Sequence, residues 1–146
     1  MEKYYNRPSG LVKAMNGFFG WIAGRGLGPK KTVAIEVRGR TSGLARKVPV
    51  TLVELDGKQY LVAPRGETEW VRNVRADQGL ATFHRGGSEN VLLTEVPEAD
   101  RAPIIQKYLG ENAMATKASF GIEPDAPIEE FQRIAGNHPV FLVEPR

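Results

Sequence analysis

Short segments rich in apolar and β-branched residues follow one another along most of this chain, and hydrophobic and polar positions alternate within them. Alternation puts successive side chains on opposite faces of a strand, so each segment predicts a strand with one buried face. Asp56-Gly57 and Gly86-Gly87 separate pairs of these segments and predict hairpin turns. The predicted strands are residues 32–38, 46–55, 58–63, 79–84 and 89–96, with a last one in the C-terminal HPVFLVEP.

Elsewhere the apolar residues recur with the spacing of amphipathic helices. Residues 10–24 carry one apolar face, which predicts a helix packed on the core. A short helix begins within residues 64–77, and residues 98–109 predict another helix that ends at Gly110. The inward side chains of this last helix would be Ile104, Ile105, Tyr108 and Leu109.

A further helix is predicted near the C-terminal end. Asp125 and Pro127 suit its N-cap and first turn, and Gly136 suits its end. Its buried stripe would be Ile128, Phe131, Ile134 and Ala135. About six strands joined by hairpins need no crossover connections, which argues against a doubly wound parallel sheet. We therefore expect a mainly β fold, a closed or split antiparallel barrel with peripheral helices.

Composition narrows the classes of function. A chain of 146 residues suits one domain, 1–146. The absence of cysteine excludes disulfides and thiolate sites, and two histidines argue against a metal centre, so no metal is expected. A formal charge of +3 does not by itself indicate nucleic acid. With no bilayer-spanning apolar run and no signal-peptide pattern, a cytoplasmic protein is expected. Phe18, Phe19 and Trp21 leave open a peripheral membrane contact through residues 10–24.

Positive charge gathers in the segment GRTSGLARKVPV. Arg40, Arg46 and Lys47 surround a turn whose backbone amides, from Thr41 to Gly43, would add neutral donors for an anion. Arginine suits phosphate and carboxylate because its fork donates two parallel hydrogen bonds. The alternative is a solvated loop that serves solubility. Pro49 cannot donate to a strand ladder, so it should lie at an edge or a bulge.

A second segment, APRGETEWVRN, favours a binding site over a solvated loop. Arg65-Gly66 lies after a strand and before a helix start, where unpaired amides favour an anion. Trp70 and Asn73 share a helical face and offer an aromatic wall and a directional hydrogen bond. Alternatively, Trp70 belongs to the core and Asn73 to the helix surface. Two basic, glycine-containing loops at strand ends together predict a groove for a ligand with an aromatic head and a charged tail.

These segments resemble the deazaflavin (F420)-dependent nitroreductases, also called F420H2-dependent quinone reductases, of the flavin and deazaflavin split β-barrel superfamily. The family pattern is a G-R-x-S-G turn, an R-x-x-P strand, a hairpin, a small-residue and glycine loop, and W-x-x-N. The likeness runs from about residue 10 to the C-terminal HPVFLVEP, and four of these elements occur in order between Gly39 and Asn73. They read Gly39-Arg40-Thr41-Ser42-Gly43, Arg46-Lys47-Val48-Pro49, Ala63-Pro64-Arg65-Gly66 and Trp70-Val71-Arg72-Asn73.

The resemblance implies an FMN-binding-like split β-barrel that binds reduced coenzyme F420 and passes hydride to a quinone, an enone or a nitro compound. The anionic phosphate and glutamate tail of the coenzyme would contact Arg40, Arg46 and Lys47, with donors from Thr41, Ser42 and Gly43. Its ring would lie by Val48, Pro49, Ala63, Pro64 and Gly66, with Trp70 and Asn73 bracing the pocket, and Arg65 would also belong to the coenzyme site.

No catalytic group is assigned, and Tyr108 and Ser119 are the candidates for a proton donor. The alternatives are an FMN-binding barrel, a cofactor carrier without turnover, and a module whose basic rim contacts RNA or an anionic membrane. The last would need exposed aromatics among the basic residues, whereas the aromatics here fall mainly at predicted core positions. A monomer and a homodimer both agree with the family likeness.

Overall fold

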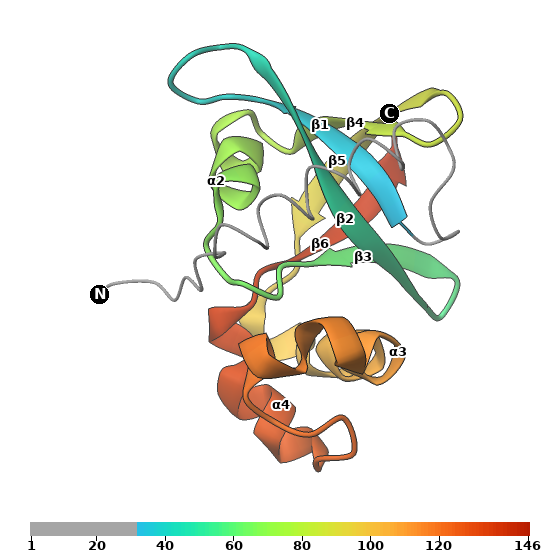
Figure 1. Ribbon diagram of the computed structural model, residues 1–146, viewed down its shortest axis with the longest axis vertical. Helices are drawn as coiled ribbons and strands as arrows, with labels where there is room; N and C mark the ends of the chain where they lie inside the picture. The colour runs from blue at the N-terminus through green and yellow to red at the C-terminus, as the bar shows by residue number, and fades with distance from the viewer. Residues whose placement is uncertain (1–31) are drawn as a thin grey trace.

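The computed structural model describes residues 32–146, apart from the side chains of residues 114–117. Its main feature is a closed barrel of six antiparallel strands in the order β1-β2-β3-β6-β5-β4 (Figure 1). The strands are β1 (Thr32–Arg38), β2 (Ala45–Leu55), β3 (Lys58–Val62), β4 (Leu80–His84), β5 (Ser88–Glu95) and β6 (Val140–Pro145). The predicted antiparallel barrel with peripheral helices is confirmed. The helix expected over residues 10–24 lies outside the described residues.

Both predicted hairpin turns are present. Asp56 and Gly57 have φ values of 53° and 77°, and two positive φ values in succession make the turn that matches the right-handed twist of the strands. The β4–β5 hairpin turns through Gly86, whose φ is 69°. Pairing of β1 with β4, with Ile35 opposite Phe83, then closes the barrel.

The long strand β2 changes partner along its length. Its first seven residues, from Ala45 to Thr51, pair with β1, and its last four, from Leu52, pair with β3. Pro49 therefore lies in a part of β2 that has a paired strand on one side, as predicted from its missing N–H. This half of β2 leads directly out of the basic turn.

Two hydrophobic clusters lie on opposite sides of the barrel wall. Alternation along β2 sends Val50 and Leu52 into the barrel interior and Val53 into a second cluster beneath the C-terminal helices. Helix α2 (Glu69–Ala76) adds Val71 and Val74 to the interior cluster, so it is anchored on the barrel. The other buried interior residues are Val33, Ile35, Val37, Leu61, Ala63, Ala81, Phe83, Val91, Leu93 and Phe141.

The second cluster lies under helices α3 (Ala102–Phe120) and α4 (Ile128–Ile134), which lie side by side below the barrel in Figure 1. Short 3-10 turns, η1 (Glu98–Asp100) and η2 (Ala135–Asn137), flank these helices. The predicted inward residues of α3 are all buried, as are Phe131, Ile134 and Ala135, while Ile128 is half-buried. None of the helices in the described part of the chain combines the length and apolar character needed to cross a membrane.

Three predicted helix boundaries differ from those of the structure. Helix α3 continues through Gly110, and its break comes at Asn112, where φ is −129° and ψ is 26°. A glycine inside a helix costs only about 1 kcal/mol, which packing on the second cluster offsets. Helix α4 begins at Ile128 with the extended residue Pro127 at its N-cap, so Asp125 is not the cap. At its other end α4 stops at Ile134, and η2 carries the chain past Gly136.

Candidate functional site

The basic turn between β1 and β2 is a tight, internally bonded structure. The Gly39 amide donates to the Leu44 carbonyl at 2.8 Å, and the Gly43 amide donates to the Gly39 carbonyl at 2.9 Å. Gly43 has a φ of 74°, which favours glycine at this position. The Ser42 hydroxyl oxygen accepts from the Leu44 amide at 3.2 Å. Because the Gly43 backbone amide donates within the turn, the predicted backbone donors that remain for a ligand are the amides of Thr41 and Ser42.

Helix α2 holds this turn through Asn73. The Asn73 Oδ1 atom accepts from the Arg40 backbone amide at 3.1 Å and from Arg40 Nη1 at 2.8 Å. Asn73 is 3% exposed, so both bonds are sheltered from water at the acceptor. The sequence alternative of a surface asparagine is therefore wrong. Asn73 is a buried acceptor that fixes the backbone and the guanidinium of Arg40 together.

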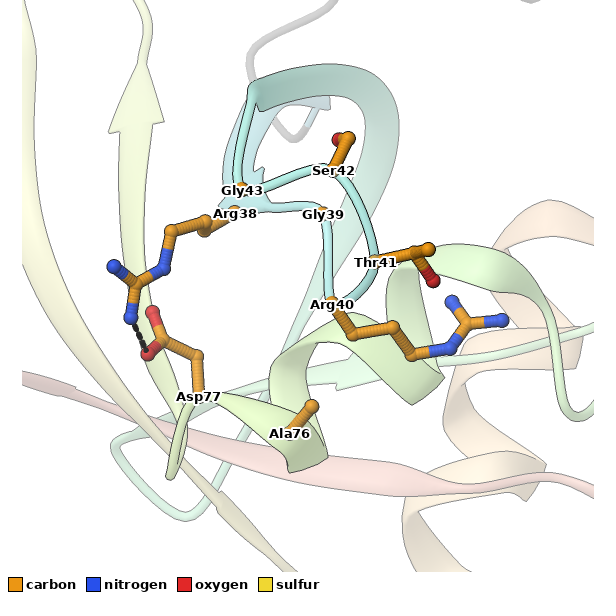
Figure 2. A pocket seen from close by; sticks show the side chains of 8 residues that line it. All are labelled: Arg38, Gly39, Arg40, Thr41, Ser42, Gly43, Ala76 and Asp77. Carbon is orange, nitrogen blue, oxygen red and sulfur yellow. Dashed lines mark hydrogen bonds and ion pairs between the residues drawn. The ribbon is translucent and has the colours of Figure 1, made fainter.

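Two ion pairs join the same turn to the two ends of α2. Arg40 Nη1 lies 2.8 Å from a carboxylate oxygen of Glu69, the first residue of the helix. Arg38 Nη2 lies 2.8 Å from Oδ1 of Asp77, the C-cap residue. Figure 2 shows the Arg38 side chain reaching Asp77 on one side of the turn, while the Arg40 side chain points to the other side. Each guanidinium thus has a carboxylate from α2 beside it.

A pocket of about 370 Å³ lies between the turn and the C-terminal end of α2 (Figure 2). Its lining residues are Arg38, Gly39, Arg40, Thr41, Ser42, Gly43, Ala76 and Asp77. Four predicted site residues, Arg40 to Gly43, are therefore brought to one wall. Three lining residues were not predicted as site residues from the sequence: Arg38, Ala76 and Asp77. No local signal marks them, because their place in the wall depends on how α2 docks.

The strand places Arg46 and Lys47 on opposite faces of β2. Arg46 shares its face with Val48 and Val50, which belong to or pack against the interior cluster. Its Nε atom would lie 3.3 Å from a Cβ atom built on Gly39, so the guanidinium lies against the turn. Lys47 lies on the face of Pro49 and Thr51, toward the second cluster. The structure thus brings Arg40 and Arg46 together and separates Lys47 from them.

Positive charge from the turn acts on Glu69. The hydrogen bond from Arg40 is the largest influence, and with the charges of Arg40, Arg72 and Arg46 it holds the pKa of this carboxyl below its ordinary value. Burial of the carboxyl group is the next-largest influence and opposes this effect, but the pKa remains lowered. Three guanidiniums therefore surround one exposed carboxylate near the N-terminus of α2.

The loop from β3 to α2 carries the second predicted segment. The Ala63 amide donates to the Pro139 carbonyl at 2.9 Å, and the Gly66 amide donates back to the Ala63 carbonyl at 3.1 Å. Gly66 has a φ of 84°. The Ala63 carbonyl also lies 3.3 Å from Nδ1 of His138, whose pKa burial lowers to about 4. Ala63, Pro64, Arg65 and Gly66 thus form an ordered loop outside the lining of the pocket.

Trp70 takes a packing role in the described structure. Its ring centroid lies 5.7 Å from that of Phe141 at a tilt of 53°, and the half-buried indole packs against the interior cluster. This agrees with the alternative reading of Trp70 as a core residue. The rest of the indole is accessible from the surface.

A network of four charged residues ties α2 to the rest of the barrel. Arg75 donates to both Glu95 oxygens, at 2.8 and 2.6 Å, and also to Glu67. Arg101 donates to the same Glu95 at 3.1 Å and to the Val96 carbonyl at 2.8 Å. The hydrogen bond with Glu95 raises the pKa of Arg75 above its ordinary value, so this guanidinium stays ionised. The network fixes the loop that enters α2 as well as the helix itself.

The two candidate proton donors lie away from the pocket wall. Tyr108 is 4% exposed in the second cluster, where burial raises its pKa to about 12 and its hydroxyl bonds to Thr51 on β2. Ser119 is half-buried near the C-terminal end of α3. Neither residue lines the pocket at the turn. Thr51, the partner of the Tyr108 hydroxyl, lies on the same face of β2 as Pro49.

Comparison with known proteins identifies the class. Residues 12–128 match the model of the family described as F420H(2)-dependent quinone reductase. A solved structure of an F420-H2 dependent reductase, FDR-A, is 22% identical, with a TM-score of 0.52 over 79% of this chain and 95% of that one. A structure described as a domain-swapped dimer is 20% identical, with a TM-score of 0.53 over 81% and 83%.

A third solved structure, Atu2129 from Agrobacterium tumefaciens str. C58, a protein of unknown function, is 14% identical. Its TM-score is 0.55 over 86% of this chain and 52% of that one. A comparison with curated proteins finds no match. At these identities the structural likenesses show the split-barrel fold alone.

The closed barrel, with a basic, hydroxyl-bearing turn between β1 and β2, agrees with the split-barrel fold of these solved structures. The match over most of its length shows that the chain belongs to the F420H2-dependent quinone reductase family. It is an oxidoreductase that takes hydride from reduced coenzyme F420 and gives it to an acceptor. The resemblance stated from the motifs is confirmed.

Proposed function

We propose that the β1–β2 turn and α2 hold the anionic part of F420. The supporting observation is the pocket wall from Arg38 to Gly43, which brings together two arginines, whose side chains lie on opposite sides of the turn, two hydroxyl groups and the backbone amides of Thr41 and Ser42. This donor set fits phosphate and carboxylate groups, which accept charge-assisted hydrogen bonds. Arg46 lies against the same turn on the inner face of β2. Lys47, on the opposite face, would contact a different part of the coenzyme.

The ring of F420 would lie along the half of β2 that pairs with β1 alone. Pro49 is on this half, and the Ala63–Gly66 loop begins just beyond the last β2–β3 pair, Leu52 with Leu61. The hydrogen bond between Ala63 and Gly66 fixes the loop, and Trp70 and Asn73 on α2 would brace the pocket for the ring. The bound coenzyme supplies hydride chemistry from a carbon that replaces the central flavin nitrogen, and the protein orients it and excludes water.

The acceptor would be a small electron-poor molecule, and the family to which the chain belongs favours a quinone over an enone or a nitro compound. Tyr108 and Ser119 remain the candidates for proton delivery. Of these, Tyr108 is linked to β2 through Thr51, and burial raises its pKa to about 12, which makes release of its proton harder. Residues 1–146 would act as one domain, as a monomer or a homodimer, with lipid contact through residues 10–24 as a further expectation.

The proposed coenzyme site can be tested with Arg46→Ala. The apoprotein is titrated with oxidised F420 and with a deazaflavin riboside that lacks the phosphate and glutamates, and fluorescence quenching reports binding. We expect F420 to bind more weakly by about 1.5–3 kcal/mol, since a charge-assisted hydrogen bond is lost. The truncated ligand should bind as to the wild type.

Lys58→Ala is the matched control, because it removes one exposed positive charge at the other end of β2. It should leave both affinities unchanged. Equal losses of both ligands in Arg46→Ala would show that Arg46 supports the fold and not the tail. Titration with FMN in parallel tests the alternative coenzyme, which should bind less tightly because it carries a phosphate without glutamates.

A further inference from the structure

The strongest unexplained feature of the site is an acidic residue at its most basic point. Glu69 is 65% exposed, yet it bonds Arg40 and lies within electrostatic reach of Arg46 and Arg72. A carboxylate here neutralises part of the charge that would attract an anionic coenzyme. Glu69 is the acidic residue in the first turn of α2, where the helix N-terminus favours a carboxylate, but that preference does not require a bond to Arg40.

Arg40 does not depend on Glu69 for its position. Asn73 Oδ1 accepts from both the backbone amide and Nη1 of Arg40, and Asn73 is buried whereas Glu69 is at the surface. If the Glu69 side chain rotates into solvent, the guanidinium keeps its neutral acceptor and its place in the pocket wall. The ion pair can therefore open without loss of the turn.

We propose that Glu69 is a displaceable counter-ion, which occupies the place of a ligand anion beside Arg40 and sets how much negative charge a coenzyme must carry to bind. This inference rests on the proposed coenzyme site and adds a residue that controls its specificity. A ligand with a phosphate and several carboxylates competes well with one exposed carboxylate. A ligand without them gains nothing from Arg40 while Glu69 remains in place.

Glu69→Gln tests the proposal, because glutamine keeps the size of the side chain and removes its charge. Affinities for F420 and for the truncated deazaflavin riboside are measured at low ionic strength by fluorescence quenching. We expect F420 to bind about two- to fivefold more tightly than to the wild type, the range given by an exposed ion pair. The truncated ligand should bind with unchanged affinity.

Glu129→Gln is the matched control. Glu129 is an exposed glutamate in the first turn of α4, so its replacement makes the same change in net charge in the first turn of another helix, far from the β1–β2 turn (Figure 1). It should leave F420 affinity unchanged. A thermal unfolding curve for each variant shows that both remain folded at the temperature of the titration.

Two results would overturn the inference while the proposed site stands. Weaker or unchanged F420 binding in Glu69→Gln, with Arg46→Ala still weakened, would make Glu69 a support of the turn or a bystander. Equal tightening of both ligands would exclude competition for the anionic tail. If the wild type fails to bind F420, or Arg46→Ala binds it equally well, the coenzyme site itself is refuted, and the inference with it.

Discussion

Replacement of Asn73 by alanine should separate the turn from α2. The change removes the one acceptor that holds both the Arg40 amide and its Nη1 atom, at 3.1 and 2.8 Å. A neutral hydrogen bond contributes about 1 kcal/mol and one to a charged group about 1.5–3 kcal/mol. The Arg40 side chain is 33% exposed, so water replaces part of the second bond and its contribution belongs at the lower end of that range.

The expected loss is therefore about 2 kcal/mol in the free energy of unfolding, which lowers the melting temperature by about 4–8 °C. Urea unfolding followed by circular dichroism measures the first quantity and a thermal scan the second. Binding of F420 should also weaken, because the turn is no longer held against the helix. Asn90→Ala is the control: Asn90 is exposed and accepts a single bond from Thr82, at 3.2 Å.

The control should lose less than about 0.5 kcal/mol, as exposed substitutions usually do. Wild-type stability together with wild-type F420 affinity in Asn73→Ala would refute the reasoning. It would mean that α2 and the turn are positioned by the barrel alone, and that the two hydrogen bonds contribute nothing beyond what water supplies.

Two other predictions concern the turn and the loop behind it. Gly39→Ala places a Cβ atom 2.8 Å from Ser42 Oγ and 3.3 Å from Arg46 Nε, so it should weaken F420 binding about three- to tenfold in a titration. Gly87→Ala is the control and should leave the affinity unchanged, because a Cβ atom there meets nothing within 4 Å. Equal affinities of the two variants would show that Ser42 and Arg46 need not hold these positions. Because burial lowers the pKa of His138 from 6.5 to about 4, the unfolded chain binds more protons between these values, and the free energy of unfolding should fall by about 2 kcal/mol from pH 7.5 to pH 5. Urea unfolding at both values checks this, and the same pH dependence in His138→Gln would contradict it.

The strands and the barrel could be predicted because they depend on the local alternation of apolar and polar residues. They also depend on turns whose residues adopt the required backbone conformation by themselves. Asp56-Gly57 specifies its hairpin, and the alternation from Val48 to Leu52 continues unbroken into the basic segment. That same alternation already implies that Arg46 and Lys47 face opposite ways. We predicted that Arg46 and Lys47 act together because they are neighbours in the chain, whereas the strand places their side chains on opposite faces.

The acidic partners of the site could not be predicted. Arg38 and Asp77 are 39 residues apart, and Arg40 and Glu69 are 29 apart, so nothing local connects them. Their contact exists because Val71 and Val74 dock α2 on the barrel interior, and periodicity predicts which face is buried without saying where the helix lies. The end of α3 was misplaced for a related reason, since tertiary packing outweighs the weak helix propensity of Gly110.

The charged network behind α2 limits how the site can be exchanged between proteins. A chimera that carried the β1–β2 turn and α2 into another barrel would bring Arg75 without its partner Glu95, which lies on β5 and itself pairs with Arg101, just before α3. A guanidinium deprived of its partners in a partly buried place costs several kcal/mol. The smallest transferable cassette therefore includes the end of β5 and the residue before α3, although neither contributes a wall of the pocket.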